Sequence, residues 1–143
     1  MMIFAQEPYT SIPYVVEKLA HEHFEEAGIW QKTFKLNVNM KTYMNDKVRL
    51  FTMATEQDEI VAYAVFFVLD HHHMSGVEFA MNDALYMKEE YRKEYSADFL
   101  KFIESQLDVD VIQYSMNYTN AHGNFMRFHG YVPNEIVYHK VLV

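Results

Sequence analysis

The sequence contains no cysteine, and only four glycines, three prolines and one tryptophan among its 143 residues. The lack of cysteine excludes disulfides, thiolate catalysis and cysteine-ligated zinc. No apolar run approaches the length of a membrane span, and the first residues, MMIFAQEP, lack the basic and long apolar regions of a secretory signal. We therefore expect no membrane contact and a cytoplasmic location.

Basic residues are also scarce, with 12 Lys and Arg against 20 Asp and Glu and a formal net charge of −8. A protein that binds nucleic acid without sequence preference is normally basic. No direct nucleic-acid binding is therefore expected. The excess of acid favours a cationic or neutral partner such as an amine, although solubility alone is the simpler explanation.

Apolar and aromatic residues are abundant, because half of the chain is apolar and it contains 11 Tyr and 11 Phe. This composition is typical of a globular protein with a substantial core. No internal repeat, linker or low-complexity segment interrupts the chain. We therefore predict a single domain over residues 1–143.

The periodicity of the apolar residues predicts both strands and helices. Strands are expected at residues 2–5, 48–55, 60–69, 77–87, 109–116 and 136–143, and helices at 13–27, 36–45, 96–107 and 124–129. Asn82 and Asp83 interrupt the fourth strand, which fits a long strand or a bulged pair. The order predicts an α/β domain with a mixed α+β sheet: four antiparallel strands, a parallel strand–helix–strand crossover and a final antiparallel strand.

The segment 84–107 is predicted to run from a strand through a charged loop into a helix. The amides of such a loop and the N-terminus of the helix direct partial positive charge at one place. An anionic ligand is often held there. This segment is therefore the candidate binding centre of the chain.

Three stretches in this order resemble the GNAT superfamily of N-acetyltransferases. Residues 59–63, EIVAY, are similar to the turn into the family's third strand, with Ala62 in place of a glycine. Residues 85–97 resemble the fourth strand and the pyrophosphate loop R-x-x-G-x-G/A, and residues 124–135, NFMRFHGYVPNE, resemble the closing motif. The short form also resembles GNAT proteins of tailed bacteriophages, which implies the host cytoplasm as the location.

The resemblance implies that the chain uses acetyl-CoA as co-substrate and acetylates a primary amine: a small molecule, a polyamine, or a protein lysine or N-terminus. It places the pantetheine arm of acetyl-CoA against Leu85, Tyr86 and Met87, with further contacts from Asn120 and Phe125. The diphosphate is expected on the amides of the loop. The loop residues implied are Arg92, Lys93, Glu94, Tyr95, Ser96 and Ala97.

Two residues depart from the family pattern. Tyr95 stands at the first glycine of the loop, where the backbone must come close to phosphate. Met126 stands where many members carry the tyrosine that protonates the leaving thiolate, and methionine cannot donate that proton. Tyr131, Tyr118 or a water molecule could replace this tyrosine.

Direct transfer to an amine needs a base that removes a proton from the amine. The resemblance implies a carboxylate on the fourth strand, so Asp83 and Glu78 are the candidate bases and Tyr131 is the candidate acid. Each carboxylate has a structural alternative, with Asp83 in a turn or bulge and Glu78 at a solvated strand position.

The three adjacent residues His71, His72 and His73 suggest a metal site, but neighbouring side chains on a strand point to opposite faces, so none is expected.

Two alternative functions remain open. The departures at Tyr95 and Met126 favour a catalytically inactive GNAT-fold protein with an interaction, virion-associated or anti-defence role. The other alternative is an unrelated α+β binding domain. The apolar residues 136–143 could also pair across a two-fold axis, giving a homodimer.

Overall fold

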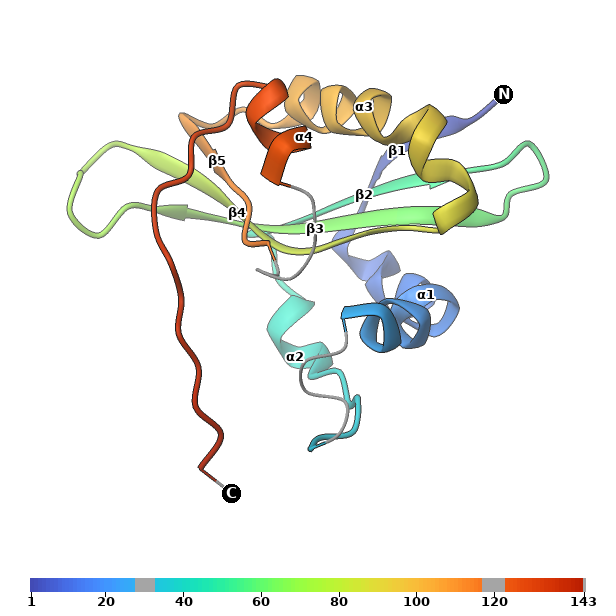
Figure 1. The fold of residues 1–143 in the computed structure, drawn as a ribbon, viewed down its shortest axis with the longest axis horizontal. Coiled ribbons are helices and arrows are strands. Elements are labelled where there is room, and N and C mark those ends of the chain that lie inside the picture. Colours follow the sequence, from blue (N-terminus) through green and yellow to red (C-terminus); the bar gives the residue numbers. More distant parts are fainter. Residues whose placement is uncertain (28–32, 117–122, 143) are drawn as a thin grey trace.

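A five-stranded mixed sheet with the order β1-β2-β3-β4-β5 forms the centre of the protein (Figure 1). The computed structural model describes residues 1–27, 33–116 and 123–142. The strands are β1 (Ile3–Glu7), β2 (Val48–Ala54), β3 (Ile60–Asp70), β4 (Glu78–Met87) and β5 (Val111–Gln113). Neighbouring strands are antiparallel except β4 and β5, which are parallel. The predicted fold class is thereby confirmed.

Helices cover both faces of this sheet (Figure 1). The helices are α1 (Ile12–Ala27), α2 (Met40–Tyr43), α3 (Glu89–Gln106) and α4 (Gly123–Phe128), and a short 3-10 turn, η1 (Tyr9–Ser11), precedes α1. On one face, Phe99 and Ile103 of α3 pack against strand residues such as Phe66. On the other face, α1 contributes Ile12, Val15 and Leu19, which recur at helical spacing. Because both faces are covered, β3 is apolar along nearly its whole length.

A β-bulge at Asp83 divides β4 into two halves. Phe66 pairs with Asn82 while Val65 pairs with Ala84, so Asp83 is the extra residue. The side chain of Asn82 compensates for the disrupted ladder, because its Nδ2 donates to the carbonyls of Val65 (3.2 Å) and Ala84 (2.8 Å). An extra residue also shifts the alternation of side chains between the faces. Of the two sequence alternatives, the bulged form is therefore correct.

Besides the start of α3, which lies at Glu89 rather than near residue 96, three predicted elements differ in the structure. The helix expected at residues 36–45 is only the four-residue α2, and the strand expected at 109–116 shortens to β5. Residues 131–142 form no strand and run away from the body as an extended arm (Figure 1). Apolar alternation makes a segment suitable for a strand, but it becomes one only when a neighbouring strand accepts its hydrogen bonds. The predicted helix end at Gly28 lies outside the described residues.

Candidate active site

The two parallel strands part in the middle of β4. Residues Phe79 to Met81 of β4 pair with Val111 to Gln113 of β5. From Asn82 onward, the ladder of β4 within the described chain is with β3 alone. The parting begins directly before the bulge at Asp83. Within the described chain, the fourth and fifth strands therefore pair only over their first residues and are not paired beyond Met81.

Asp83 faces the helices that cover the α1 side of the sheet. Its Oδ2 accepts a hydrogen bond from the Tyr43 hydroxyl of α2 at 2.7 Å. The ring of Tyr43 lies against Phe67 of β3, with centroids 5.7 Å apart, which fixes the direction of this bond. Burial, followed by the hydrogen bond and the charge of Asp83, raises the pKa of Tyr43. Tyr43 therefore stays protonated and donates to a carboxylate that is itself exposed to solvent.

A second group of polar aromatic side chains lies on the same face. His23 of α1 accepts or donates through Nδ1 at 2.6 Å from the hydroxyl of Tyr63, and its ring stacks on Tyr86 at 5.1 Å. Tyr63 and Tyr86 are opposite each other on β3 and β4. Burial raises the pKa of Tyr63, and the nearby charge of Asp83 raises it further. Tyr63 thus remains a phenol, and the direction of its hydrogen bond with Nδ1 of His23 depends on the tautomer of the imidazole.

His23 is held neutral by its surroundings. Burial lowers its pKa below the ordinary 6.5; the charges of Glu26 and Asp83 oppose this effect, and Arg92 adds to it. The sequence analysis missed His23 as a site residue. The available signal was its spacing, because His23 follows the buried Leu19 by four residues and thus falls on the apolar side of α1.

This lowered pKa predicts a loss of stability in acid. The unfolded chain takes up a proton at His23 near its ordinary pKa of 6.5, whereas the folded protein does so only at lower pH. Stability is therefore complete above this pH and falls as the pH drops through it. We expect the melting temperature of the wild type to fall more than that of His23→Gln when the pH is lowered from above to below the ordinary pKa of histidine.

Glutamine keeps an acceptor for Tyr63 but does not titrate. The matched control is His21→Gln, because His21 is exposed on the same helix. Equal pH profiles for the wild type and His23→Gln in calorimetric melting would contradict the expectation.

The predicted pyrophosphate loop is wrong as a structural element, because residues 92–97 lie inside α3. Helix α3 begins at Glu89 rather than near residue 96, so these amides donate to helix carbonyls. The cause is local: the segment has no glycine, and Glu89 and Glu90 in the first turn complement the helix dipole. A phosphate-binding role for Arg92, Lys93, Glu94, Tyr95, Ser96 and Ala97 stays a prediction, but one without a loop.

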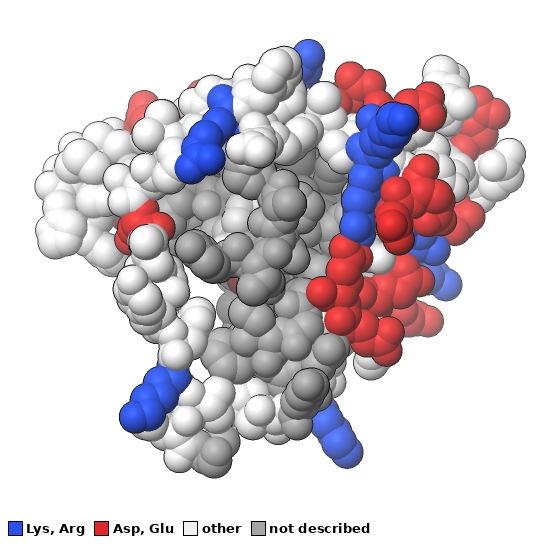
Figure 2. Space-filling model, in the orientation of Figure 1, with Lys and Arg blue, Asp and Glu red and all other residues white. Residues whose placement is uncertain are grey.

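The two basic side chains near the start of α3, Lys88 and Arg92, form ion pairs with glutamates. Arg92 is ion-paired with Glu26 and donates through Nε to the carbonyl of Met87 at 2.7 Å. Lys88 lies 3.8 Å from Glu22 and 3.4 Å from a carboxylate oxygen of Glu59. Figure 2 shows acidic side chains gathered around the start of α3 and the neighbouring α1. A diphosphate approaching this surface would meet negative charge.

The remaining β4 residues of the cofactor prediction pack against the two faces of the sheet. Leu85 packs with the core on the α3 side, Tyr86 is buried on the α1 side, and Met87 ends the strand. The Tyr86 hydroxyl donates to Glu22 at 3.2 Å, and burial first, then this contact, raises the pKa of Tyr86 to about 12. Their contact with a cofactor stays a prediction.

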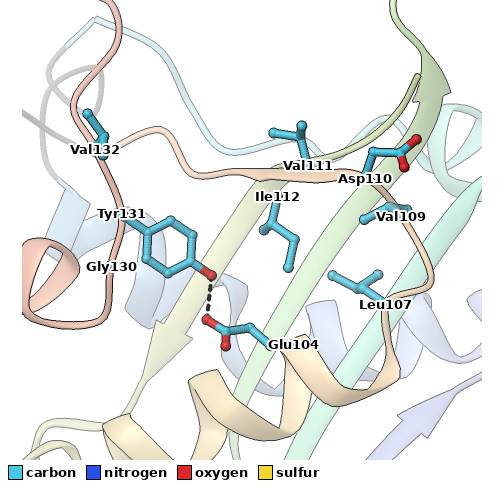
Figure 3. Close-up of a pocket in the computed structure, with 9 residues that line it drawn as sticks. All are labelled: Glu104, Leu107, Val109, Asp110, Val111, Ile112, Gly130, Tyr131 and Val132. Carbon is cyan, nitrogen blue, oxygen red and sulfur yellow. Dashed lines mark hydrogen bonds between the residues drawn. The ribbon is translucent and has the colours of Figure 1, made fainter.

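The other two catalytic candidates lie away from Asp83. Glu78 is the first residue of β4, roughly 16 Å from Asp83 along five extended residues, and its amide donates to Asp110 at 2.8 Å. Tyr131 lies on the α3 side, where its hydroxyl donates to Glu104 at 2.7 Å (Figure 3). Burial and this bond raise the pKa of Tyr131. The structure therefore brings only Asp83 into the polar cluster.

Phe125 lies on α4 with its ring centroid 4.6 Å from that of His129. The other two predicted residues, Asn120 and Tyr118, lie outside the described residues.

Across the described ranges, no group of three His, Asp or Glu side chains lies close enough together to hold a metal ion. In the same ranges, every helix is too short or too polar to cross a membrane.

Comparison with known proteins gives structural matches alone. No protein-family model matches the sequence, and no curated protein matches it. A tetramutant protein from Bacillus halodurans aligns over 98% of this chain and 99% of its own, with 16% identity and a TM-score of 0.73. A ribosomal-protein-alanine N-acetyltransferase from Brucella melitensis covers 100% and 99%, with 7% identity and a TM-score of 0.69.

An aminoglycoside acetyltransferase from an uncultured soil metagenomic sample, solved in complex with sisomicin, covers 99% of this chain and 95% of its own. Its identity is 14% and its TM-score 0.67. Identities this low establish the fold alone. The chain has the fold of the GNAT acetyltransferases, with the same mixed sheet and parallel β4–β5 pair.

Proposed function

We propose that this chain is an N-acetyltransferase that transfers the acetyl group of acetyl-CoA to a primary amine by direct attack. The observation that carries the proposal is Asp83, an exposed carboxylate in the bulge where β4 and β5 part, oriented by Tyr43. The acetyltransferase fold and the net charge of −8 support the same function. The acceptor would be a small-molecule amine, a polyamine, or a protein lysine or N-terminus.

The residues around Asp83 have distinct roles in this proposal. Acetyl-CoA would supply a thioester as the electrophile: as the amine nitrogen forms a bond to the acetyl carbon, the C–S bond would break and CoA would leave as a thiolate that takes a proton from water. Asp83 accepts a proton from the ammonium group, which makes the amine nucleophilic. Tyr43 holds the carboxylate in position through its hydrogen bond. The hydrogen bond between His23 and Tyr63 holds these two rings in place on the same face of the sheet as Asp83.

The two ends of the site differ in how well they suit acetyl-CoA. The β4 end suits the pantetheine arm, since beyond Met81 one side of the strand has no β5 partner in the described chain. The α3 end presents a helix in place of an amide loop, and Arg92 and Lys88 are paired with glutamates. No contact with the diphosphate follows from this arrangement.

The test is acetyl-CoA binding by calorimetry together with thiol release from acetyl-CoA over a panel of amines. Because the chain has no cysteine, all thiol that a colorimetric reagent detects comes from released CoA. We expect saturable binding and amine-dependent release. Absence of both at millimolar acetyl-CoA would refute the proposal.

A second candidate function is a GNAT-fold protein without transferase activity that acts through protein interaction. The helical segment 92–97 and the paired cations favour it, because they remove the usual place for the diphosphate. In the first candidate, acetyl-CoA binds although Glu22 and Glu26 of α1 pair with Lys88 and Arg92; in the second, these pairs prevent acetyl-CoA from binding.

Neutralising these glutamates should strengthen acetyl-CoA binding. In Glu22→Gln/Glu26→Gln, Lys88 and Arg92 lose two carboxylate partners and become available to phosphate. We expect about three- to tenfold tighter binding, since each exposed ion pair is worth about 0.2–1 kcal/mol. The measurement is a calorimetric titration at low salt, with the exposed Glu25→Gln on the same helix as control. Undetectable binding in every variant would favour the second candidate.

A further inference from the structure

Five apolar side chains form a strip on the α1 side of the sheet, next to the bulge of β4. The register pairs Phe67 with Met81 and Leu69 with Phe79, and opposite residues of an antiparallel pair share a face. Phe67 packs with the buried cluster of α1, so all four side chains lie on that side. Val111 of β5 is the register partner of Phe79 and extends the same surface. We call these five residues the apolar strip.

The helices cover only one end of the apolar strip. Figure 1 shows that β3 and β4 extend beyond α1 and α2 toward the turn that connects them. The ring of Tyr43 in α2 lies against Phe67, with centroids 5.7 Å apart. Further along, Met81 is 37% exposed and Val111 38% exposed. Neighbouring large apolar side chains that stay exposed mark a surface for a ligand or a partner.

A single carboxylate lies at the covered end of the strip. Asp83 follows Met81 by two residues, and its Oδ2 accepts the hydrogen bond of the Tyr43 hydroxyl at 2.7 Å. Because the ring of Tyr43 also lies on Phe67, one side chain connects the candidate base to the strip. The apolar strip is thus continuous with the candidate active site.

The far end of the strip has no matching carboxylate on its own strands. Asp70 and Glu78 are opposite each other in the register, and each is next in sequence to a residue of the strip. Neighbouring residues of a strand point to opposite faces, so both carboxylates belong to the α3 side. On the strip side, the ring of His71 lies against Phe79, with centroids 4.7 Å apart. The surface therefore offers one negative charge followed by apolar and aromatic groups.

We propose that the apolar strip binds the carrier of the acceptor amine, so that the acceptor is a primary amine at the end of an alkyl or aryl chain rather than a polyamine. This inference rests on the proposed acetyl transfer and selects among its acceptors. The ammonium group pairs with Asp83, and the chain lies along Met81 and Phe79, roughly 7 and 13 Å further along the extended strand. A second cation on the chain would lose water there without gaining a carboxylate.

The first test measures kcat/KM for methylamine, butylamine, octylamine and octamethylenediamine by thiol release. We expect kcat/KM to rise about twofold per methylene from methylamine to octylamine, because a fully buried methylene is worth about fourfold and the strip is open on one side. The diamine has the same chain with a second ammonium group, and should be at least about tenfold poorer than octylamine. A flat series, or a diamine as good as octylamine, would overturn the proposal.

The second test places a carboxylate in the strip with Met81→Glu. We expect the preference for octylamine over the diamine, expressed as a ratio of kcat/KM, to fall by about tenfold. The matched control is Ile3→Glu, because Ile3 is 46% exposed on β1 at the opposite edge of the sheet and should keep the wild-type ratio. Circular dichroism shows whether the variant is folded, and Val111→Glu is the substitute if it is not. An unchanged ratio in the folded variant would contradict the role of the strip.

A binding measurement distinguishes failure of this inference from failure of acetyl transfer. Octylamine and octanoate are each titrated into the protein by calorimetry without acetyl-CoA. We expect saturable binding of octylamine and at least about tenfold weaker binding of octanoate, whose head group Asp83 repels. Saturable octylamine binding without thiol release from any amine would support the strip and refute acetyl transfer. Thiol release together with equal or absent binding of the two ligands would refute the strip alone.

Discussion

Replacing Asp83 with asparagine is expected to lower kcat/KM for amine acetylation by about 10²- to 10⁴-fold, the usual contribution of a positioned base. Asparagine keeps an oxygen that can accept the Tyr43 hydrogen bond, so the loop geometry around α2 should survive. What it removes is the ability to take a proton from the ammonium. The measurement is thiol release at saturating and limiting amine, combined with the melting temperature of both proteins.

The matched control is Glu78→Gln, the other carboxylate of β4 that the sequence nominated. Because Glu78 lies at the far end of the strand and only its backbone contacts Asp110, we expect its activity to stay within about twofold of the wild type. Tyr43→Phe, which leaves the carboxylate but removes its donor, should fall between the two. If Asp83→Asn retained full turnover, the base would have to lie elsewhere.

Truncating Phe66 to alanine is expected to destabilise the protein by about 3–5 kcal/mol, the range for a fully buried phenylalanine. Phe66 is 0% exposed, and its ring makes edge contacts with Phe51 at 5.8 Å and Tyr114 at 5.5 Å. It also sits at the register shift, opposite Asn82. Its loss therefore leaves a cavity beneath the place where β4 and β5 part. Urea unfolding followed by circular dichroism measures the change.

The variant Phe67→Ala tests whether Phe67 holds Tyr43 in place, separately from its contribution to the stability of the fold. Phe67 is only partly buried and faces the opposite side of the sheet, where it lies against Tyr43. We expect a smaller loss of stability than for Phe66→Ala, together with a lower kcat because Tyr43 is no longer held against Asp83. A variant with unchanged kcat would show that Tyr43 does not need this contact.

The predicted and observed folds agree best where the apolar pattern is strong. Helix α1 and strands β2, β3 and β4 have repeating apolar positions, and no bound of these elements differs from the prediction by more than one residue. Shorter or weaker patterns were less informative, since a four-residue helix and a three-residue strand cannot be distinguished from irregular chain by periodicity.

At residues 92–97 the family resemblance predicted a loop, whereas the local sequence favours the helix that is present. The motif predicted irregular backbone, but the residues present are good helix formers without glycine. Helix propensity and the acidic first turn therefore extend α3 back to Glu89. The sequence contained the information needed for this correction at Tyr95, where the glycine is missing.

The sequence by itself determined the fold class, because apolar periodicity sets the elements and their order. The family resemblance, not the pattern, nominated Asp83 and Glu78 as alternative candidate bases. Only the tertiary structure decided which side chains surround Asp83. His23, Tyr43, Tyr63 and Tyr86 come from four separate elements, and packing of α1 and α2 on one face of the sheet brings them together. Contacts between separate elements produce no regular spacing in a single sequence, so they could not be predicted from it. The charged residues at the start of α3 and the apolar residues of the arm are visible in the sequence, but their positions in the fold are not.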